Sequence, residues 1–183
     1  VGEEGLDLTT VDLVVFFENP DRKFERIKET LATSKHGDEI YKTIFNLWEN
    51  IKSKEKIQAK FREATGLDND IIFLDHHLSH AASAYLVSGY EEAALVTIDG
   101  VGEKTTTTIG RGTGNKIEML QEIEFPHSIG LLYTALTVFL GFRPFDGEYK
   151  VMGLAAYGKN SREQNLYYAK LRETVQIFDD GSF

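Results

Sequence analysis

Cysteine is missing from the 183 residues, and its absence removes several kinds of site at once. Without cysteine the chain has no disulfide, no thiolate zinc site and no thiol nucleophile, which suits a reducing compartment. No uninterrupted apolar run approaches the roughly 20 residues of a membrane span, because the longest, Ile129 to Phe142, contains Tyr133, Thr134 and Thr137. We therefore expect a cytoplasmic location and no membrane partner.

A surplus of positive charge is also lacking. Twenty Lys and Arg residues stand against 29 Asp and Glu residues, which gives a formal net charge of −9. A chain this acidic is not generally attracted to nucleic acid, so we expect no nucleic-acid partner. The composition, 42% hydrophobic and 27% charged, is typical of a globular protein, and the length allows one large domain or two small lobes. Because the sequence opens at Val1 within a pattern, we expect a piece of a larger protein.

Apolar β-rich runs alternate with helical patterns along the chain. Strands are expected over residues 11–17, 71–74, 93–98, 105–110 and 116–125, and the last two form a hairpin around a glycine-rich turn. Helices are expected over residues 21–32, 38–64, 75–87, 127–140 and 163–172. The first of these runs, residues 11–17, is expected to be a buried strand, and Trp48 is expected in the core. This order predicts an α/β fold with a mixed sheet and helices on its faces.

The segment His76-His77-Leu78-Ser79-His80 is the strongest chemical signal. On a helix, His76 and His80 project from one face, and two neutral imidazoles so placed offer half of a transition-metal site. Such pairs also cap helices or satisfy hydrogen bonds in a core. His77 points elsewhere and is expected to make a backbone or supporting hydrogen bond, while the small residues that follow allow close packing on a strand.

Asp99-Gly100-Val101-Gly102-Glu103 stands where an apolar strand gives way to glycine. The carboxylate of Asp99 can meet a metal, and glycine backbone at positions 100 and 102 can aim N–H groups at a phosphate. With two histidines and one aspartate as ligands, iron, manganese and zinc are all admissible. The alternative is an ordinary strand–turn–strand with an exposed acidic tip.

A third segment, Gly147 to Gly158, combines charged residues with glycines around a small apolar middle. Its N–H groups and Lys150 can hold a nucleotide at the start of a helix. The alternative is a surface loop in which Lys150 and Glu148 pair with each other.

Taken together, these segments resemble the amino-terminal domain of the O-carbamoyltransferases of the nodulation-factor and antibiotic-tailoring type. The resemblance is dense from about Ile71 to Gly158 and general elsewhere. The matching motifs stand at His76 to Ala84, Asp99 to Thr108, Pro126 to Tyr133, Gly141-Phe142 and Gly147 to Gly158.

The resemblance implies an actin-like ATPase fold (sugar kinase/Hsp70-like), of the subtype shared with the threonylcarbamoyl-adenosine enzymes. It implies transfer of a carbamoyl group from carbamoyl phosphate, through ATP-dependent carbamoyl-adenylate, to a hydroxyl of a sugar or natural-product acceptor. His76, His80 and Asp99 would be the catalytic residues and the ligands of a divalent metal, Fe²⁺ before Mn²⁺ or Zn²⁺. The nucleotide would be lined by Gly100, Gly102, Glu103, Gly147, Glu148, Lys150 and Gly153.

The resemblance also implies parts that these 183 residues do not supply. Residues 1 to about 90 would end a first lobe and residues 91–183 would begin a second. A first β-hairpin, a further metal-binding aspartate and a YrdC-like partner domain of the same parent chain would lie outside, so we expect the piece alone to be inactive. The alternatives are a tRNA threonylcarbamoyl-transfer relative, which the net negative charge does not suit, and a non-catalytic metal- or nucleotide-binding module.

Overall fold

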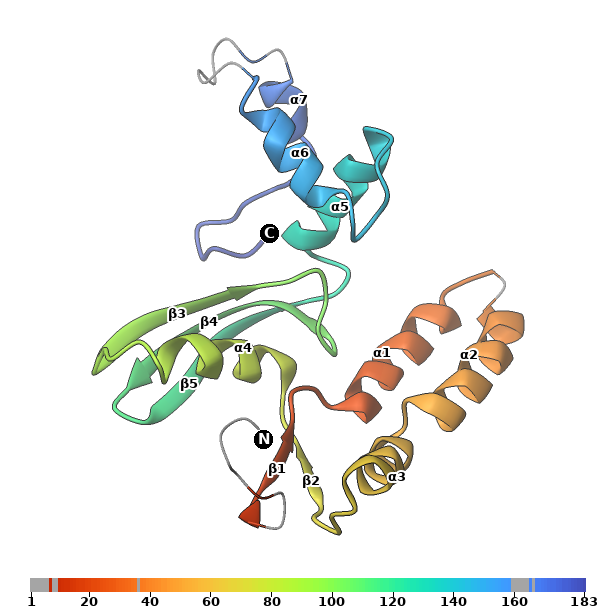
Figure 1. The fold of residues 1–183 in the computed structure, drawn as a ribbon. Helices are drawn as coiled ribbons and strands as arrows, with labels where there is room; N and C mark the ends of the chain where they lie inside the picture. The colour runs from red at the N-terminus through yellow and green to blue at the C-terminus, as the bar shows by residue number, and fades with distance from the viewer. Residues whose placement is uncertain (1–6, 8–9, 36, 159–164, 166) are drawn as a thin grey trace.

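The computed structural model describes residues 7, 10–35, 37–158, 165 and 167–183. Figure 1 shows the arrangement of their helices and strands. In chain order these are β1 (Val14–Phe16), α1 (Pro20–Ala32), α2 (Gly37–Ile51), α3 (Lys54–Thr65), β2 (Ile71–Phe73), α4 (His76–Tyr85), β3 (Glu92–Ile98), β4 (Thr105–Thr113), β5 (Lys116–Glu124), α5 (Ile129–Phe139), α6 (Glu148–Ala155) and α7 (Tyr168–Arg172).

β1 and β2 form a two-stranded parallel sheet in which Phe16 faces Phe73. The chain leaves both strands at the same end, toward the start of α4 (Figure 1). The prediction that this first run is buried was wrong, since Val15 is 48% and Phe17 53% exposed. Within the described part of the chain, a two-stranded sheet leaves a face uncovered, and alternate side chains of each strand point to it.

The helices after β1 differ from the sequence prediction at one point. The single helix expected over 38–64 is two helices, because Ser53 has an extended backbone and its hydroxyl accepts from the N–H of Lys56 to start α3. Trp48 is buried and stacks on Phe24, with ring centroids 5.1 Å apart, so its expected core role is confirmed.

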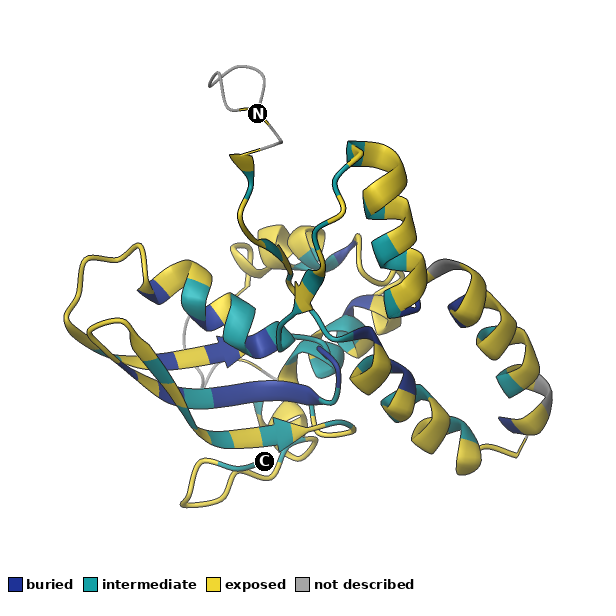
Figure 2. Ribbon diagram, turned by 90° about the horizontal axis from the view of Figure 1, so that it is seen from below, coloured by how far each residue is buried: buried dark blue, intermediate teal, exposed yellow. Residues whose placement is uncertain are grey.

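β3, β4 and β5 form an antiparallel sheet in that order, and α4 packs against it (Figures 1 and 2). The predicted hairpin is confirmed, with Thr113 facing Lys116 across its turn. Ala81 and Tyr85 of α4 lie on Leu95 of β3, which confirms the expected close approach of this helix to a strand.

The central strand of this sheet is buried through threonines rather than aliphatic residues, as the dark ribbon of Figure 2 shows. Hydrogen bonds hold two of these hydroxyl groups within the sheet: Thr108 meets Thr97 at 2.6 Å, and Thr106 donates to the carbonyl oxygen of Ile123. The hydroxyl of Thr107 has no partner among the described residues. These hydrogen bonds fix β3 and β4 relative to each other. They therefore fix both ends of the loop that connects the two strands.

The chain ends in α5, α6 and α7, which stand beyond the end of the sheet (Figure 1). Of the helix expected over 163–172, the structure has Tyr168–Arg172, while residues 163, 164 and 166 lie outside the described residues. None of the helices in the described part combines the length and apolar character that a bilayer crossing requires. The predicted α/β class is confirmed, but the single mixed sheet is not: in the described part of the chain the strands form one parallel sheet and one separate antiparallel sheet.

Candidate metal centre

The start of α4 is set by Asp75, which precedes the helix with an extended backbone. Its carboxylate accepts from the N–H groups of His77 and Leu78 at 3.1 and 3.2 Å and therefore satisfies two of the free donors of the first turn. Arg22 of α1 binds the other oxygen of Asp75 at 2.8 Å. This cap makes His76 the first helical residue and places His80 one turn further on the same face.

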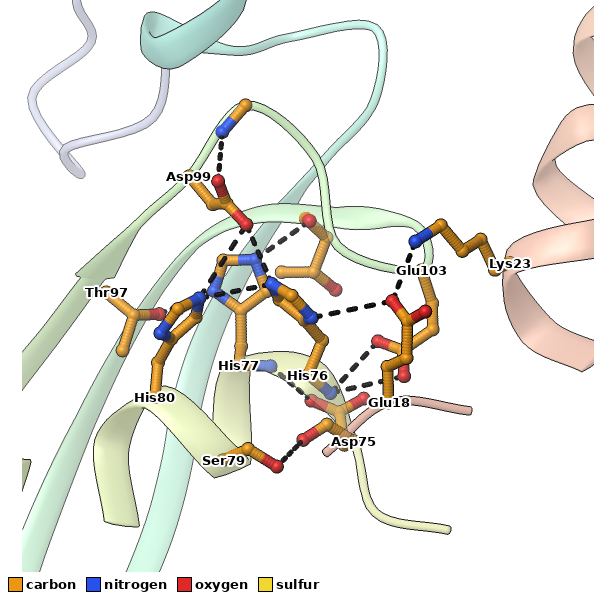
Figure 3. A network of polar contacts seen from close by, with 12 residues as sticks. Glu18, Lys23, Asp75, His76, His77, Ser79, His80, Thr97, Asp99 and Glu103 are labelled. Carbon is orange, nitrogen blue, oxygen red and sulfur yellow. Dashed lines mark hydrogen bonds and ion pairs between the residues drawn. The ribbon is translucent and has the colours of Figure 1, made fainter. Parts of the chain in front are cut away.

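Asp99 meets both histidine rings from the end of β3 (Figure 3). Oδ2 of Asp99 lies 2.8 Å from Nε2 of His76 and 3.7 Å from Nε2 of His80, and the two nitrogens are 3.1 Å apart. The side chain of His76 is 14% exposed and that of His80 52% exposed. The structure therefore brings together the three predicted ligands, with one open side at His80.

The three atoms fit one cation. Ligands held at about 2.0–2.1 Å from a single ion lie roughly 2.8–3.4 Å from each other, the shorter values in octahedral and the longer ones in tetrahedral geometry. The observed separations of 2.8 and 3.1 Å lie within this range, and the third, 3.7 Å, is slightly longer. Two imidazoles and one carboxylate also leave coordination positions free, as in sites where a metal acts on a substrate.

The electrostatics of Asp99 favour its charged form. Burial alone would raise the pKa of this carboxyl group, but the N–H of Gly100 at 2.6 Å, the hydrogen bond from His76 and the charges of His76 and His80 outweigh burial and lower it. The carboxylate is therefore ready to bind a cation without first losing a proton.

His77 supports the centre from the buried side, as predicted. Its Nε2 donates to the carbonyl oxygen of Thr105 at 2.9 Å, so Nδ1 is the acceptor for the hydroxyl of Thr97. Burial lowers the pKa of His77 and outweighs the hydrogen bond to Thr105, which acts in the opposite direction. A neutral His77 thus ties the helix of the two ligand histidines to both strands beneath it.

Glu103, predicted to line a nucleotide, is 1% exposed. Its carboxylate accepts from the N–H of Asn19 at 2.5 Å and from the N–H of His76 at 3.1 and 3.2 Å. It therefore holds the β1–α1 turn and the start of α4 together. The nucleotide-binding role of Glu103 stays a prediction. Both carboxylate oxygens already accept hydrogen bonds from backbone N–H groups.

The glycine loop differs in detail from the sequence argument. The N–H of Gly100 donates to the carboxylate of its neighbour Asp99, and that of Gly102 donates to the carbonyl oxygen of Thr105 at 2.9 Å. The expectation that both groups are aimed outward at a phosphate was therefore wrong, because the tight turn uses them itself. A Cβ at Gly102 would lie 3.0 Å from the His76 ring, so this glycine allows the loop to approach α4.

The remaining predicted nucleotide residues lie on a different part of the molecule. Gly147 precedes α6, and Lys150 and Gly153 lie on it, while Figure 1 shows α6 apart from α4, beyond α5. The carboxylate of Glu148 accepts from Thr134 and from the N–H of Phe145, and Lys150 places Nζ 5.6 Å from the centre of the Tyr149 ring. The structure therefore does not bring this group to the metal centre.

Two surface grooves also distinguish the metal centre from the rest of the molecule. A groove of about 370 Å³ begins at His80 and runs between α4 and β3. A larger one of about 530 Å³ lies between the start of α5 and the C-terminal segment and includes none of the predicted site residues. Geometry favours the smaller groove for chemistry at the metal centre, since only that one contains a predicted ligand.

Sequence reasoning missed Glu18, which lies beside His76 in Figure 3. Oε2 of Glu18 is 3.7 Å from Nδ1 of His76 and 2.7 Å from Nζ of Lys23. The signal was present: two parallel strands end side by side, so polar residues that follow them, here Glu18 and Asp75, meet at one edge.

Comparison with known proteins agrees with the resemblance found in the sequence motifs. The family model described as carbamoyltransferase N-terminus matches residues 1–179. An uncharacterized protein of Synechocystis sp. is 41% identical over 192 residues, which cover all of this chain and 30% of that protein. The nodulation protein NolNO of Sinorhizobium fredii is 38% identical over 113 residues, or 62% of this chain and 16% of that protein.

A third relative, the nodulation protein NolO of Bradyrhizobium diazoefficiens, is 36% identical over 110 residues, or 60% of this chain and 19% of that protein. The matched parts are therefore less than a third of the length of each of these relatives.

Proposed function

This chain belongs to the carbamoyltransferase N-terminus family, and we propose that it forms part of an O-carbamoyltransferase. The reaction proposed is transfer of a carbamoyl group to a hydroxyl of a sugar or natural-product acceptor. The observation that carries the proposal is the convergence of His76, His80 and Asp99 in a member of this family. The names of the two nodulation proteins add support for a hydroxylated acceptor through the resemblance stated above.

The proposed donor is carbamoyl-adenylate, made from carbamoyl phosphate and ATP. In the transfer the acceptor oxygen bonds to the carbamoyl carbon, the bond from that carbon to the phosphate oxygen breaks and releases AMP, and the proton of the acceptor hydroxyl passes to water. A divalent metal, Fe²⁺ with Mn²⁺ or Zn²⁺ as alternatives, would supply a positive centre that polarises the donor.

The chain's own residues act mainly by positioning. His76 and His80 present two nitrogens from adjacent helical turns, and the charged Asp99 approaches them from a second element. His77 and Glu103 fix these elements relative to each other. The groove beside His80 gives an acceptor access from the open side of the centre. Because the adenylate provides a good leaving group, orientation replaces a covalent nucleophile.

The wider organisation is also a proposal. An actin-like ATPase fold, a bound nucleotide and a YrdC-like domain elsewhere in the parent chain follow from the resemblance. The proposed division into two lobes near residue 90 would place α4 in the first lobe. However, α4 packs on the sheet formed by residues after 90, so the two parts share a core. Exposed apolar side chains such as Leu13 and Val96 suit further packing in a longer protein.

The test uses the full-length protein with ATP, carbamoyl phosphate, a divalent metal and a panel of hydroxylated acceptors. We expect carbamoylated product by mass spectrometry and its loss in D99N. H127A serves as the control, because His127 is an exposed histidine outside the centre. Full turnover by D99N contradicts the assigned centre. Modification of tRNA instead of small acceptors selects the threonylcarbamoyl-transfer alternative, and metal binding without turnover selects the non-catalytic one.

A further inference from the structure

We propose that Glu18 is a positioning residue of the metal centre, acting through the ring of His76. Its carboxylate would accept the hydrogen on Nδ1 of His76, so that Nε2 of the same ring presents its lone pair to the cation. The inference rests on the proposed function, since it requires a cation between His76, His80 and Asp99.

The first observation is a ring nitrogen without a partner. Among the described residues, Nδ1 of His76 is buried and makes no hydrogen bond, although the other nitrogen of the ring meets Asp99 at 2.8 Å. Leaving a buried polar group without a hydrogen-bond partner is unfavourable. An atom in this position therefore needs an acceptor when it carries hydrogen.

Glu18 supplies that acceptor. Its Oε2 is 3.7 Å from Nδ1, and the two side chains are only 15% and 14% exposed. This separation is longer than a hydrogen bond, so a shift of roughly 1 Å by the ring or the carboxylate has to accompany cation binding. Figure 3 shows Glu18 on the side of the His76 ring opposite Asp99 and His80.

The fold places Glu18 independently of any metal. The residue follows β1, whose parallel register with β2 brings it to the start of α4. Lys23 holds its Oε2 at 2.7 Å, and Phe17 packs on the His76 ring with centroids 5.8 Å apart. Lys23 thus holds the carboxylate while Phe17 packs on the ring that the carboxylate would orient.

The chemistry follows from the two ring nitrogens. A neutral imidazole carries hydrogen on one nitrogen and a lone pair on the other, and the hydrogen bond made by the first decides which one binds metal. A carboxylate at Nδ1 also makes Nε2 a more basic ligand. Asp99 has a comparable support, since its Oδ1 accepts from the N–H of Gly100 at 2.6 Å.

The experiment measures Co²⁺ affinity and the visible Co²⁺ absorption band of the full-length protein. Loss of such a supporting carboxylate typically weakens metal binding about 10- to 100-fold, which is the loss expected for E18A. E18Q is expected to lose less, because its amide oxygen still accepts from Nδ1. E29Q is the matched control, because Glu29 also pairs with a lysine, Lys104 at 2.8 Å, but lies away from His76. The Co²⁺ affinity of E29Q should stay within twofold of the wild-type value.

Four outcomes decide between these possibilities. If E18A binds Co²⁺ like the wild type while H76A does not, the role of Glu18 is overturned and the metal centre stands. If H76A itself binds normally, the metal centre fails. Because E18A strands Lys23, the double variant E18A/K23M restores the charge balance, and recovery of wild-type affinity there also overturns the inference. Continued weakness, with the absorption band altered, supports it.

Discussion

Nε2 of His76 and Oδ2 of Asp99 lie 2.8 Å apart, although 23 positions separate the two residues in the chain. The contact joins the first turn of α4 to the end of β3, and His80 completes it from the next helical turn. A charged carboxylate and two imidazoles in this arrangement give a compact site for one divalent cation.

Replacing a ligand should remove the cation. D99N and H80A each remove one of the three ligands. Zn²⁺ or Co²⁺ affinity should therefore fall by more than about 100-fold, which is the upper limit for losing a residue that only supports a ligand. Equilibrium dialysis with elemental analysis measures bound metal per chain. H127A should retain the wild-type value, and unchanged stoichiometry in D99N would show that the cation binds elsewhere.

Gly102 and Gly100 should respond differently to alanine. A Cβ at position 102 would stand 3.0 Å from the ring of His76 and 3.1 Å from that of His77, whereas one at position 100 meets only Leu131 at an ordinary 3.6 Å. Such crowding destabilises by about 1–3 kcal/mol. We expect G102A to lose about tenfold in metal affinity and G100A to stay within twofold, as measured by chelator competition. Equal affinities would contradict the proposed contact of the loop with the ligand rings.

Glu103 should matter more to stability than its position in a loop suggests. E103A leaves the N–H groups of Asn19 and His76 without an acceptor, at about 1–3 kcal/mol each, so the free energy of unfolding should fall by about 2–6 kcal/mol. Urea denaturation measures the change. E118A is the control, because Glu118 is exposed and pairs with Arg111 at the surface, where such pairs contribute about 0–1 kcal/mol. Equal losses in the two variants would refute the bridging role.

The packing of α4 on the sheet depends on Gly112. Any Cβ there would overlap the ring of Tyr85, whose hydroxyl donates to the carbonyl oxygens of Glu91 and Gly114. G112A should therefore lower the melting temperature and weaken metal binding, because the helix of both histidines is displaced. G153A, in a helix with free space around it, should instead stabilise by up to about 1 kcal/mol. A harmless G112A would mean that α4 does not pack on the sheet as described.

Local rules predicted much of the site. The four-residue spacing of His76 and His80 on a helix, the strand that ends at Asp99 and the separate orientation of His77 all follow from periodicity, and each is found. The break at Ser53 was missed because the apolar stripe continues across it, although serine before a helical turn is a readable capping signal. The expected free N–H groups of Gly100 and Gly102 were wrong, since their partners depend on the loop's own closure.

Other features required contacts across long stretches of chain. Glu18 reaches His76 only because β1 pairs with β2, and Glu103 reaches Asn19 across 84 positions. No local pattern encodes such pairs, because each depends on how separate elements pack.

By itself, the sequence determined the family, the alternation of helices and strands and the identity of three candidate ligands, since these follow from residue type and spacing. Tertiary structure alone decided that the ligands meet, that buried His77 and Glu103 hold their elements in place and that α6 stands apart. The physical reason is that periodicity fixes which way a side chain faces along one element, whereas distances between elements come from packing and long-range hydrogen bonds.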